Sequence, residues 1–204
     1  MEGLVVSEAK LVVVVPPSMS KRIPEAVLQE LSFHLFKYNE IFGGVLLAYD
    51  IRIDGKEAGV LQDILPHICV SLSGNLLVFN PKPDMLLEGT VVKLTPESIH
   101  VVVLGFASAV IVDEDIREEL EYVDGRDGEV YQSKYHKHHV IKIGTVLRFQ
   151  VKSLDEDIIH ICGSLAPTGT GSVKWLEKRN MGTQMLDSTK GADGFIIGGM
   201  LSDL

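Results

Sequence analysis

Residues 76–89 have the sequence Leu76-Leu77-Val78-Phe79-Asn80-Pro81-Lys82-Pro83-Asp84-Met85-Leu86-Leu87-Glu88-Gly89, and this stretch decides the fold. A strand-like apolar run ends at two prolines one residue apart, and a second strand-like run begins almost at once. Proline has no backbone N–H and restricts the residue before it, so neither a helix nor an inner strand can continue through this point. The stretch therefore predicts a short, stiff linker between two folded halves, which favours a positioning role over an enzyme.

The first half has the pattern of a small sheet with one helix. Residues 9–15 are a run rich in β-branched side chains that ends at Pro16-Pro17, which predicts a buried strand. The pair Pro24-Glu25 suits the first turn of a helix, and apolar residues then recur every three or four positions as far as Phe42. The pair Gly43-Gly44 would end this helix. Further strands are predicted over residues 45–53, 68–72 and 76–79.

The second half has the pattern of a small β-barrel. Short strands separated by turn-rich pieces are predicted over residues 89–94, 99–104, 107–112, 145–153 and 158–165. Five short strands with this spacing are typical of an OB-type barrel. The expected fold class is α+β: a small N-terminal sheet with one packed helix, followed by an OB-type barrel with an insertion at residues 113–142.

We expect three parts along the chain. Residues 1–80 would form the N-terminal domain, residues 84–165 an OB/S1-like barrel with its charged insertion, and residues 166–204 a flexible tail. The tail has linker composition after Leu165, with scattered Gly, Ser, Thr and Asp. Residues 173–180 are compatible with one or two helical turns, in which Trp175 would anchor the helix to the barrel or serve as an anchor in an interface.

Composition restricts the class of protein. The chain of 204 residues is 46% hydrophobic and has a mean hydropathy of +0.20, as expected for a packed globular protein. Its net charge of −9 argues against nucleic-acid binding over the whole surface but permits a local basic patch. Cys69 and Cys162 lie far apart, and no signal peptide or membrane span is evident, so we expect buried thiols in a soluble protein inside the cell.

The two parts of the predicted insertion differ in the sign of their charge. Carboxylates dominate from Asp113 to Glu129, whereas residues 130–154 contain none and combine Lys and Arg with Tyr and Phe. Basic residues with aromatic rings beside an OB barrel are what a single-stranded nucleic-acid groove needs. A solvated loop explains the pattern equally well, and the acidic part favours docking of a protein. The candidate RNA or factor contacts in and near the insertion are Phe106, Tyr131, Lys134, Tyr135, Lys137, Lys142 and Arg148.

No catalytic residue, metal site or cofactor is predicted. The chain lacks a Gly-x-Ser-x-Gly elbow, a P-loop, a kinase signature and a GxGxxG turn after its first strand. His136, His138 and His139 lie close together, but no second segment supplies a Cys or His pair at zinc-site spacing. The three consecutive carboxylates at residues 155–157 fit a solvated turn.

The residues on both sides of the two prolines resemble a known family. Residues 42–50 and 76–83 are similar to the larger stalk subunit of eukaryotic RNA polymerases. Segments within residues 87–109 resemble the RNA polymerase I version, the A43-type subunit, more than the versions in polymerases II and III, and plant-like forms are the most similar. Segments within residues 144–165 also resemble the last barrel strands of this family. The resemblance covers about residues 4–166, and the order and spacing of the segments carry it.

The resemblance implies a tip domain that docks on the RNA polymerase I core subunits and a barrel that projects outward. It further implies no catalytic residues, a heterodimer with a smaller stalk subunit, contact with the polymerase I initiation factor and with nascent RNA, and a place in the nucleus and its nucleolus. Core docking would fall on Pro16, Pro17, Ser18, Lys21, Arg22, Gly55, Lys56 and His67. The alternatives are a stalk subunit of polymerase II or III, or a free-standing OB-type single-stranded RNA-binding protein.

Overall fold

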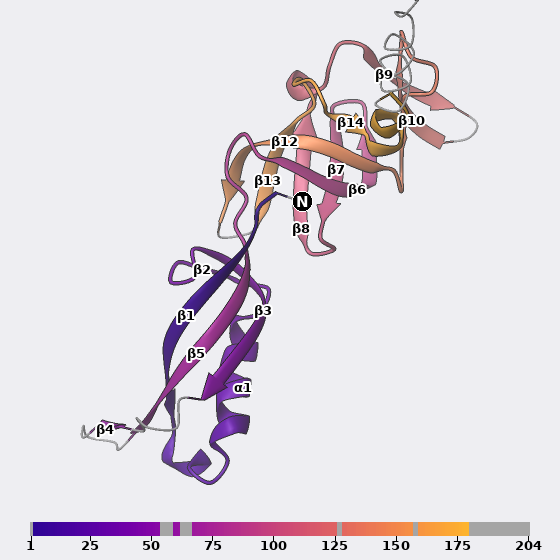
Figure 1. Cartoon of the computed structure of the whole chain (residues 1–204). Helices are drawn as coiled ribbons and strands as arrows, with labels where there is room; N and C mark the ends of the chain where they lie inside the picture. The colour runs from indigo at the N-terminus through magenta and orange to yellow at the C-terminus, as the bar shows by residue number, and fades with distance from the viewer. Residues whose placement is uncertain (1, 54–58, 62–66, 126–127, 157–158, 180–204) are drawn as a thin grey trace, which may run out of the picture.

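The computed structural model describes residues 2–53, 59–61, 67–125, 128–156 and 159–179, which form two sheet-based parts joined end to end (Figure 1). An N-terminal sheet with one α-helix lies at one end of the molecule, and a β-barrel lies at the other. This arrangement confirms the predicted α+β fold class. No helix within the described ranges is long and apolar enough to cross a membrane.

The N-terminal sheet is antiparallel and has the strand order β1-β5-β3-β2, with β4 beside β5. Its strands are β1 (Leu4–Val15), β2 (Tyr38–Asn39), β3 (Gly44–Ile53), β4 (Gly59–Leu61) and β5 (His67–Phe79). The sequence predicted two strands where β5 is continuous. Gly74 permits this continuity, because a Cβ atom at this position would collide with the backbone of Asp50 on β3.

One helix, α1 (Ile23–His34), covers a face of this sheet and follows a 3-10 turn, η1 (Pro17–Met19). Its buried residues pack in one cluster with Val13, Val15, Val70 and Leu72 of the sheet, and are Ala26, Val27 and Leu31. The helix ends at His34, so the prediction that it continues to Phe42 was wrong. Phe36 has a φ of 57° and donates its N–H to the Leu46 carbonyl at 2.9 Å, which turns the chain into β2.

The barrel is closed by five strands in the order β6-β7-β8-β13-β12, and β12 pairs in turn with β6. The strands are β6 (Leu86–Thr95), β7 (Ser98–Val103), β8 (Ala107–Val112), β12 (Val146–Asp155) and β13 (His160–Ser164). Closure depends on β13, which runs parallel to β8 and antiparallel to β12. Alternate residues point inward, as Ile99, Val101 and Val103 do on β7. The predicted OB-type barrel is confirmed.

The residues between β8 and β12 form a second, three-stranded sheet rather than a loop. A 3-10 turn, η2 (Asp113–Asp115), is followed by β9 (Leu120–Gly125), β10 (Gly128–Ser133) and β11 (Val140–Lys142). Tyr131 on β10 and Ile141 on β11 are 2% and 0% exposed and belong to the barrel core. The alternative of a solvated loop therefore does not hold for these strands.

The first part of the predicted flexible tail is packed on the barrel. The short strand β14 (Gly171–Ser172) pairs with β12, and residues 173–179 are helical. Leu176 on this helix is buried, as is Thr170 before it. Residues 166–179 are therefore not a flexible tail, because strand pairing and burial hold them in place. The remaining tail residues, 180–204, lie outside the described residues.

Candidate functional site

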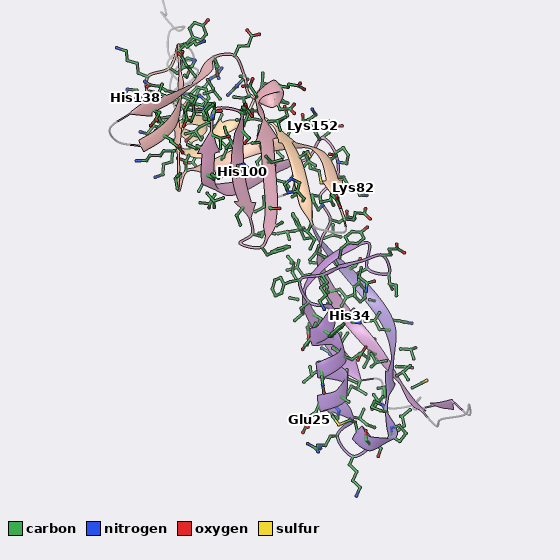
Figure 2. The ribbon with its side chains drawn as sticks, turned by 180° about the vertical axis from the view of Figure 1, so that it is seen from behind. Glu25, His34, Lys82, His100, His138 and Lys152 are labelled. Carbon is green, nitrogen blue, oxygen red and sulfur yellow. The ribbon has the colours of Figure 1, made fainter. Side chains whose placement is uncertain are left out.

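The loop between β1 and α1 lies at the end of the molecule farthest from the barrel, next to Glu25 (Figure 2). Five of the eight predicted core-docking residues lie on this loop and are exposed: Pro16, Pro17, Ser18, Lys21 and Arg22. Arg22 Nη1 lies 3.5 Å from Glu25 Oε2, a surface pair of little net strength, so the guanidinium remains available to a partner. Gly55 and Lys56 lie outside the described residues, as does the side chain of His67.

Three phenylalanines form the joint between the N-terminal sheet and the barrel. Phe106, in the turn between β7 and β8, packs edge-to-face on Phe36 and Phe79, with ring centroids 5.6 and 5.8 Å apart. Phe79 is the last residue of β5 and is fully buried within the barrel core cluster, together with Val45 of β3. The sheet therefore ends inside the barrel core, and the joint contains more than the two prolines.

Main-chain hydrogen bonds fix the chain on both sides of the prolines. Asn80 N–H donates to the Gly3 carbonyl at 2.8 Å, which ties the linker to the start of β1. Asp84 N–H donates to the Val151 carbonyl at 2.9 Å, and Leu86 N–H donates to a carboxylate oxygen of Glu2 at 2.6 Å. Because the linker is bonded to both parts, the relative orientation of the two parts is set by the structure itself.

The predicted RNA or factor contacts do not form one site. Phe106 lies in the joint, and Tyr131 lies in the barrel core, where its hydroxyl donates to the carbonyls of Thr95 and Pro96 at 2.7 and 3.1 Å. A buried ring cannot stack on a base, so the structure excludes Tyr131 as a contact in this conformation. Arg148 donates twice to Glu88 Oε1, at 2.8 and 2.6 Å. The exposed candidates are Lys134, Tyr135, Lys137 and Lys142.

A stacked pair of rings attaches the C-terminal helix to the insertion, in line with the expectation that Trp175 anchors this helix, whereas its partner His139 was not predicted. The Trp175 indole lies parallel to the His139 imidazole, with centroids 4.1 Å apart and planes at 8°. His139 is fully buried, and its Nε2 accepts the Ser172 N–H at 3.2 Å. Burial, with help from the nearby charges of Arg117 and His136, lowers the pKa of His139 to about 4, so the ring is neutral at pH 7.

No metal centre is evident in the part of the chain that the structure describes, where no three His, Cys, Asp or Glu side chains are grouped as ligands. Of the three clustered histidines, His139 uses Nε2 to hold Ser172, and His136 lies 5.3 Å from the Trp175 ring by centroids. These contacts give two of the three histidines a structural role. His138 is exposed at the outer end of the barrel (Figure 2).

The relatives found by comparison with known proteins are all RPA43 subunits. No family model matches the chain. The chain is 27% identical over 170 residues to the probable DNA-directed RNA polymerase I subunit RPA43 of Dictyostelium discoideum. This alignment covers 81% of this chain and 47% of the relative. It is 30% identical over 156 residues to the mouse DNA-directed RNA polymerase I subunit RPA43, covering 74% of this chain and 43% of the relative. The fission yeast subunit is 25% identical over 156 residues, which cover 90% of that protein.

The aligned region includes most of this chain, so the similarity extends over both the N-terminal sheet and the barrel. The chain spans about half the length of the slime mould and mouse relatives. The similarity to plant-like forms stays a prediction. With 25–30% identity to RPA43 subunits of slime mould, mammals and fission yeast, this chain belongs to the A43-type family of RNA polymerase I subunits.

Proposed function

We propose that this chain is a non-catalytic stalk subunit of RNA polymerase I that contributes to initiation-factor docking for ribosomal RNA transcription. The observation that carries the proposal is the joint, at which Phe79, Phe106 and the linker hydrogen bonds hold two folded parts end to end. An elongated molecule with a fixed joint can hold one partner at a set distance from another. The names of its relatives support RNA polymerase I as the enzyme to which it would be attached.

The exposed loop at residues 16–22 would dock on the polymerase core, and a smaller stalk subunit would cover part of the N-terminal sheet. Several apolar side chains of this part are more than half exposed, notably Val6, Val12, Phe33 and Ile41. The outer edge of β1 pairs with no strand among the described residues. Unpaired edges and exposed apolar surface are features that a partner normally covers.

Affinity purification of the tagged chain from its own cells tests the proposal. We expect the largest polymerase I subunits and a small partner protein to co-elute, and the tagged protein to concentrate in the nucleus, within the nucleolus. Co-elution of the largest subunit of polymerase II or III would instead assign the chain to that enzyme. If no polymerase subunit co-eluted, the stalk proposal would be rejected.

A free-standing RNA-binding protein is the second candidate, favoured by the exposed Lys134, Lys137 and Lys142 on the insertion. Cations near aromatic rings can track phosphates while bases stack. The same purification separates the two functions, because a free-standing protein would co-purify with RNA but not with polymerase subunits. Nascent RNA is compatible with either function.

A further inference from the structure

A hollow of about 260 Å³ lies between the insertion and the C-terminal helix, at the outer end of the barrel. Lys142 and the turn after it, Ile143-Gly144-Thr145, line one side, and the other side is lined by Ser172, Lys174, Trp175 and Lys178. We call it the lysine pocket and define it by its basic and aromatic side chains, which are His138, Lys142, Lys174, Trp175 and Lys178.

The charged side chains that line this pocket are all cationic. Lys142, Lys174 and Lys178 are exposed, and no carboxylate lines the hollow. None of the three ammonium groups has an ion-pair partner within the described ranges, whereas Lys152 binds Asp115 and Arg148 binds Glu88. Three uncompensated cations around one hollow favour a ligand that carries negative charge.

The two walls that carry these lysines are held together. His139 of the insertion stacks on Trp175 and accepts the Ser172 N–H, and Arg117 donates to the Thr170 carbonyl at 3.0 Å. Lys174 and Lys178 are four residues apart on one helix, so they lie on the same side of it. Because the helix cannot move freely away from the insertion, the backbone positions that carry the three lysines are fixed before a ligand binds.

The surface that an OB barrel most often offers to nucleic acid is different here. In this fold the second and third strands and the loops after strands one and four are the usual contacts. The corresponding strands, β7 and β8, contain no Lys or Arg; the corresponding loops carry Glu97 and Glu156, and Asp155 is the last residue of β12. Carboxylates repel phosphate, so this surface is less favourable for an anionic strand than the lysine pocket is.

We propose that the lysine pocket binds phosphate groups, supplied either by a single-stranded RNA or by a free nucleotide. The ammonium groups of Lys142, Lys174 and Lys178 contact the phosphate oxygens, and the exposed edge of Trp175 borders the sugar or base. Contact with RNA is already implied by the family resemblance, and the new element is the place of contact: Lys174, Trp175 and Lys178 of the C-terminal helix are absent from the predicted contacts, and only Lys142 is among them. The assignment does not depend on the stalk role, because the site lies on the barrel.

The chain contains a single tryptophan, Trp175, so its intrinsic fluorescence reports occupancy of the pocket directly. The full chain is titrated with a 12-nucleotide RNA, with a mononucleotide and with an oligoglutamate peptide, at several salt concentrations. We expect RNA to change the Trp175 emission and to bind about tenfold or more weakly to the triple variant K142Q/K174Q/K178Q. For single strands, each phosphate contact makes the plot of log affinity against log salt concentration steeper by about 0.7. Because the triple variant loses three such contacts, its plot should be less steep than that of wild type by about 2.

A matched variant, K10Q/K37Q/K82Q, removes the same charge from the N-terminal part and the joint, and should leave affinity within about twofold of wild type. Tight RNA binding with a steep slope identifies a strand as the phosphate source, and equal affinity for the mononucleotide identifies a free nucleotide. The proposal is overturned if neither ligand binds, if both triple variants lose affinity equally, or if only oligoglutamate binds. Unchanged circular dichroism of the variants verifies that they are folded.

Discussion

The barrel and the N-terminal sheet bury their apolar side chains differently. One continuous cluster fills the barrel and includes side chains from the insertion, whereas the buried residues of the sheet other than Val45 and Phe79 are divided between two smaller clusters. The sheet and its helix also expose large apolar side chains, among them Ile41 at 84% and Phe33 at 66%. The barrel therefore has the more continuous core, and the N-terminal part exposes more of its largest apolar side chains, as expected if a partner covers this surface.

Alanine variants of two phenylalanines, one in each part, test this difference in packing. F149A removes a fully buried ring from the barrel core and should lower the free energy of unfolding by about 3–5 kcal/mol, as large-to-small core changes do. F33A removes a ring from the exposed face of α1 and should change it by about 0.5 kcal/mol or less in the isolated chain. Urea denaturation measures both changes.

The same pair of variants tests the need for a partner. F33A should reduce recovery of the smaller stalk subunit in pull-down experiments, although the chain itself stays folded. We also expect the isolated wild-type chain to aggregate or oligomerise and co-expression with the partner to prevent this. A stable wild-type monomer, together with unchanged recovery by F33A, would show that the N-terminal part is complete without a partner.

The second prediction concerns the stability of the outer end of the barrel at acidic pH. Burial lowers the pKa of His139 to about 4 from an ordinary value near 6.5, so the unfolded chain binds this proton at a higher pH than the folded chain does. The contribution to stability is therefore complete above about pH 6.5 and is lost progressively as the pH falls toward 4, by at most about 3 kcal/mol.

Thermal unfolding of wild type and H139Q between pH 4 and 7.5 measures this loss. Glutamine has a carbonyl oxygen that can accept the Ser172 N–H and does not titrate, so the difference between the two proteins isolates His139 from the other titrating groups. We expect the wild type to lose stability relative to H139Q over this interval. Parallel curves for the two proteins would show that His139 does not control the attachment of the C-terminal helix.

The barrel was predictable from sequence because its strands are short, alternate in polarity and are separated by turns, all of which are local features. Two features of the N-terminal sheet were not predictable in this way, because they depend on contacts between residues that are not neighbours in sequence. The end of α1 is set by the bond from Phe36 to Leu46, and the continuity of β5 by the approach of Asp50 to Gly74.

The site was less predictable than the fold, for the same reason. Tyr131 has the composition of an RNA contact, and only the packing of the insertion on the barrel shows that its ring is buried. The lysine pocket joins Lys142 to Lys174 and Lys178, and no local pattern indicates that these segments meet. The basic stretch of the insertion was evident from the sequence, but the C-terminal helix that lies opposite it across the pocket was not.

The third prediction concerns the joint, where the two parts meet. F106A removes the ring that packs on both Phe36 and Phe79 and should cost about 1–2 kcal/mol, since Phe106 is only half buried. Small-angle scattering should show a wider range of shapes for F106A than for wild type. V92A, which truncates an exposed apolar side chain of the barrel outside the joint, is the control and should change the scattering little.

A glycine-serine segment inserted between Asn80 and Asp84 extends this test to function. It should impair recruitment of polymerase while both parts remain folded, because the docking loop and the barrel would lose their fixed relation. Nucleolar rRNA synthesis in cells that carry only the altered chain measures the effect. Full activity would show that the prolines separate the two parts without setting their orientation.

The smallest expected effect compares one ion pair from each part. In the barrel, Arg148 donates two hydrogen bonds to Glu88 and both side chains are about one-third exposed; near α1, Arg22 and Glu25 meet at 3.5 Å and are about two-thirds exposed. Double-mutant cycles with alanine should give a coupling of about 0.5–1 kcal/mol for the barrel pair and about 0.3 kcal/mol or less for the other. Both couplings should decrease with salt, the surface pair more completely, because water and ions screen it more. Equal couplings would mean that the barrel gives its ion pair no advantage of geometry or burial, and that the two parts differ in their apolar packing alone.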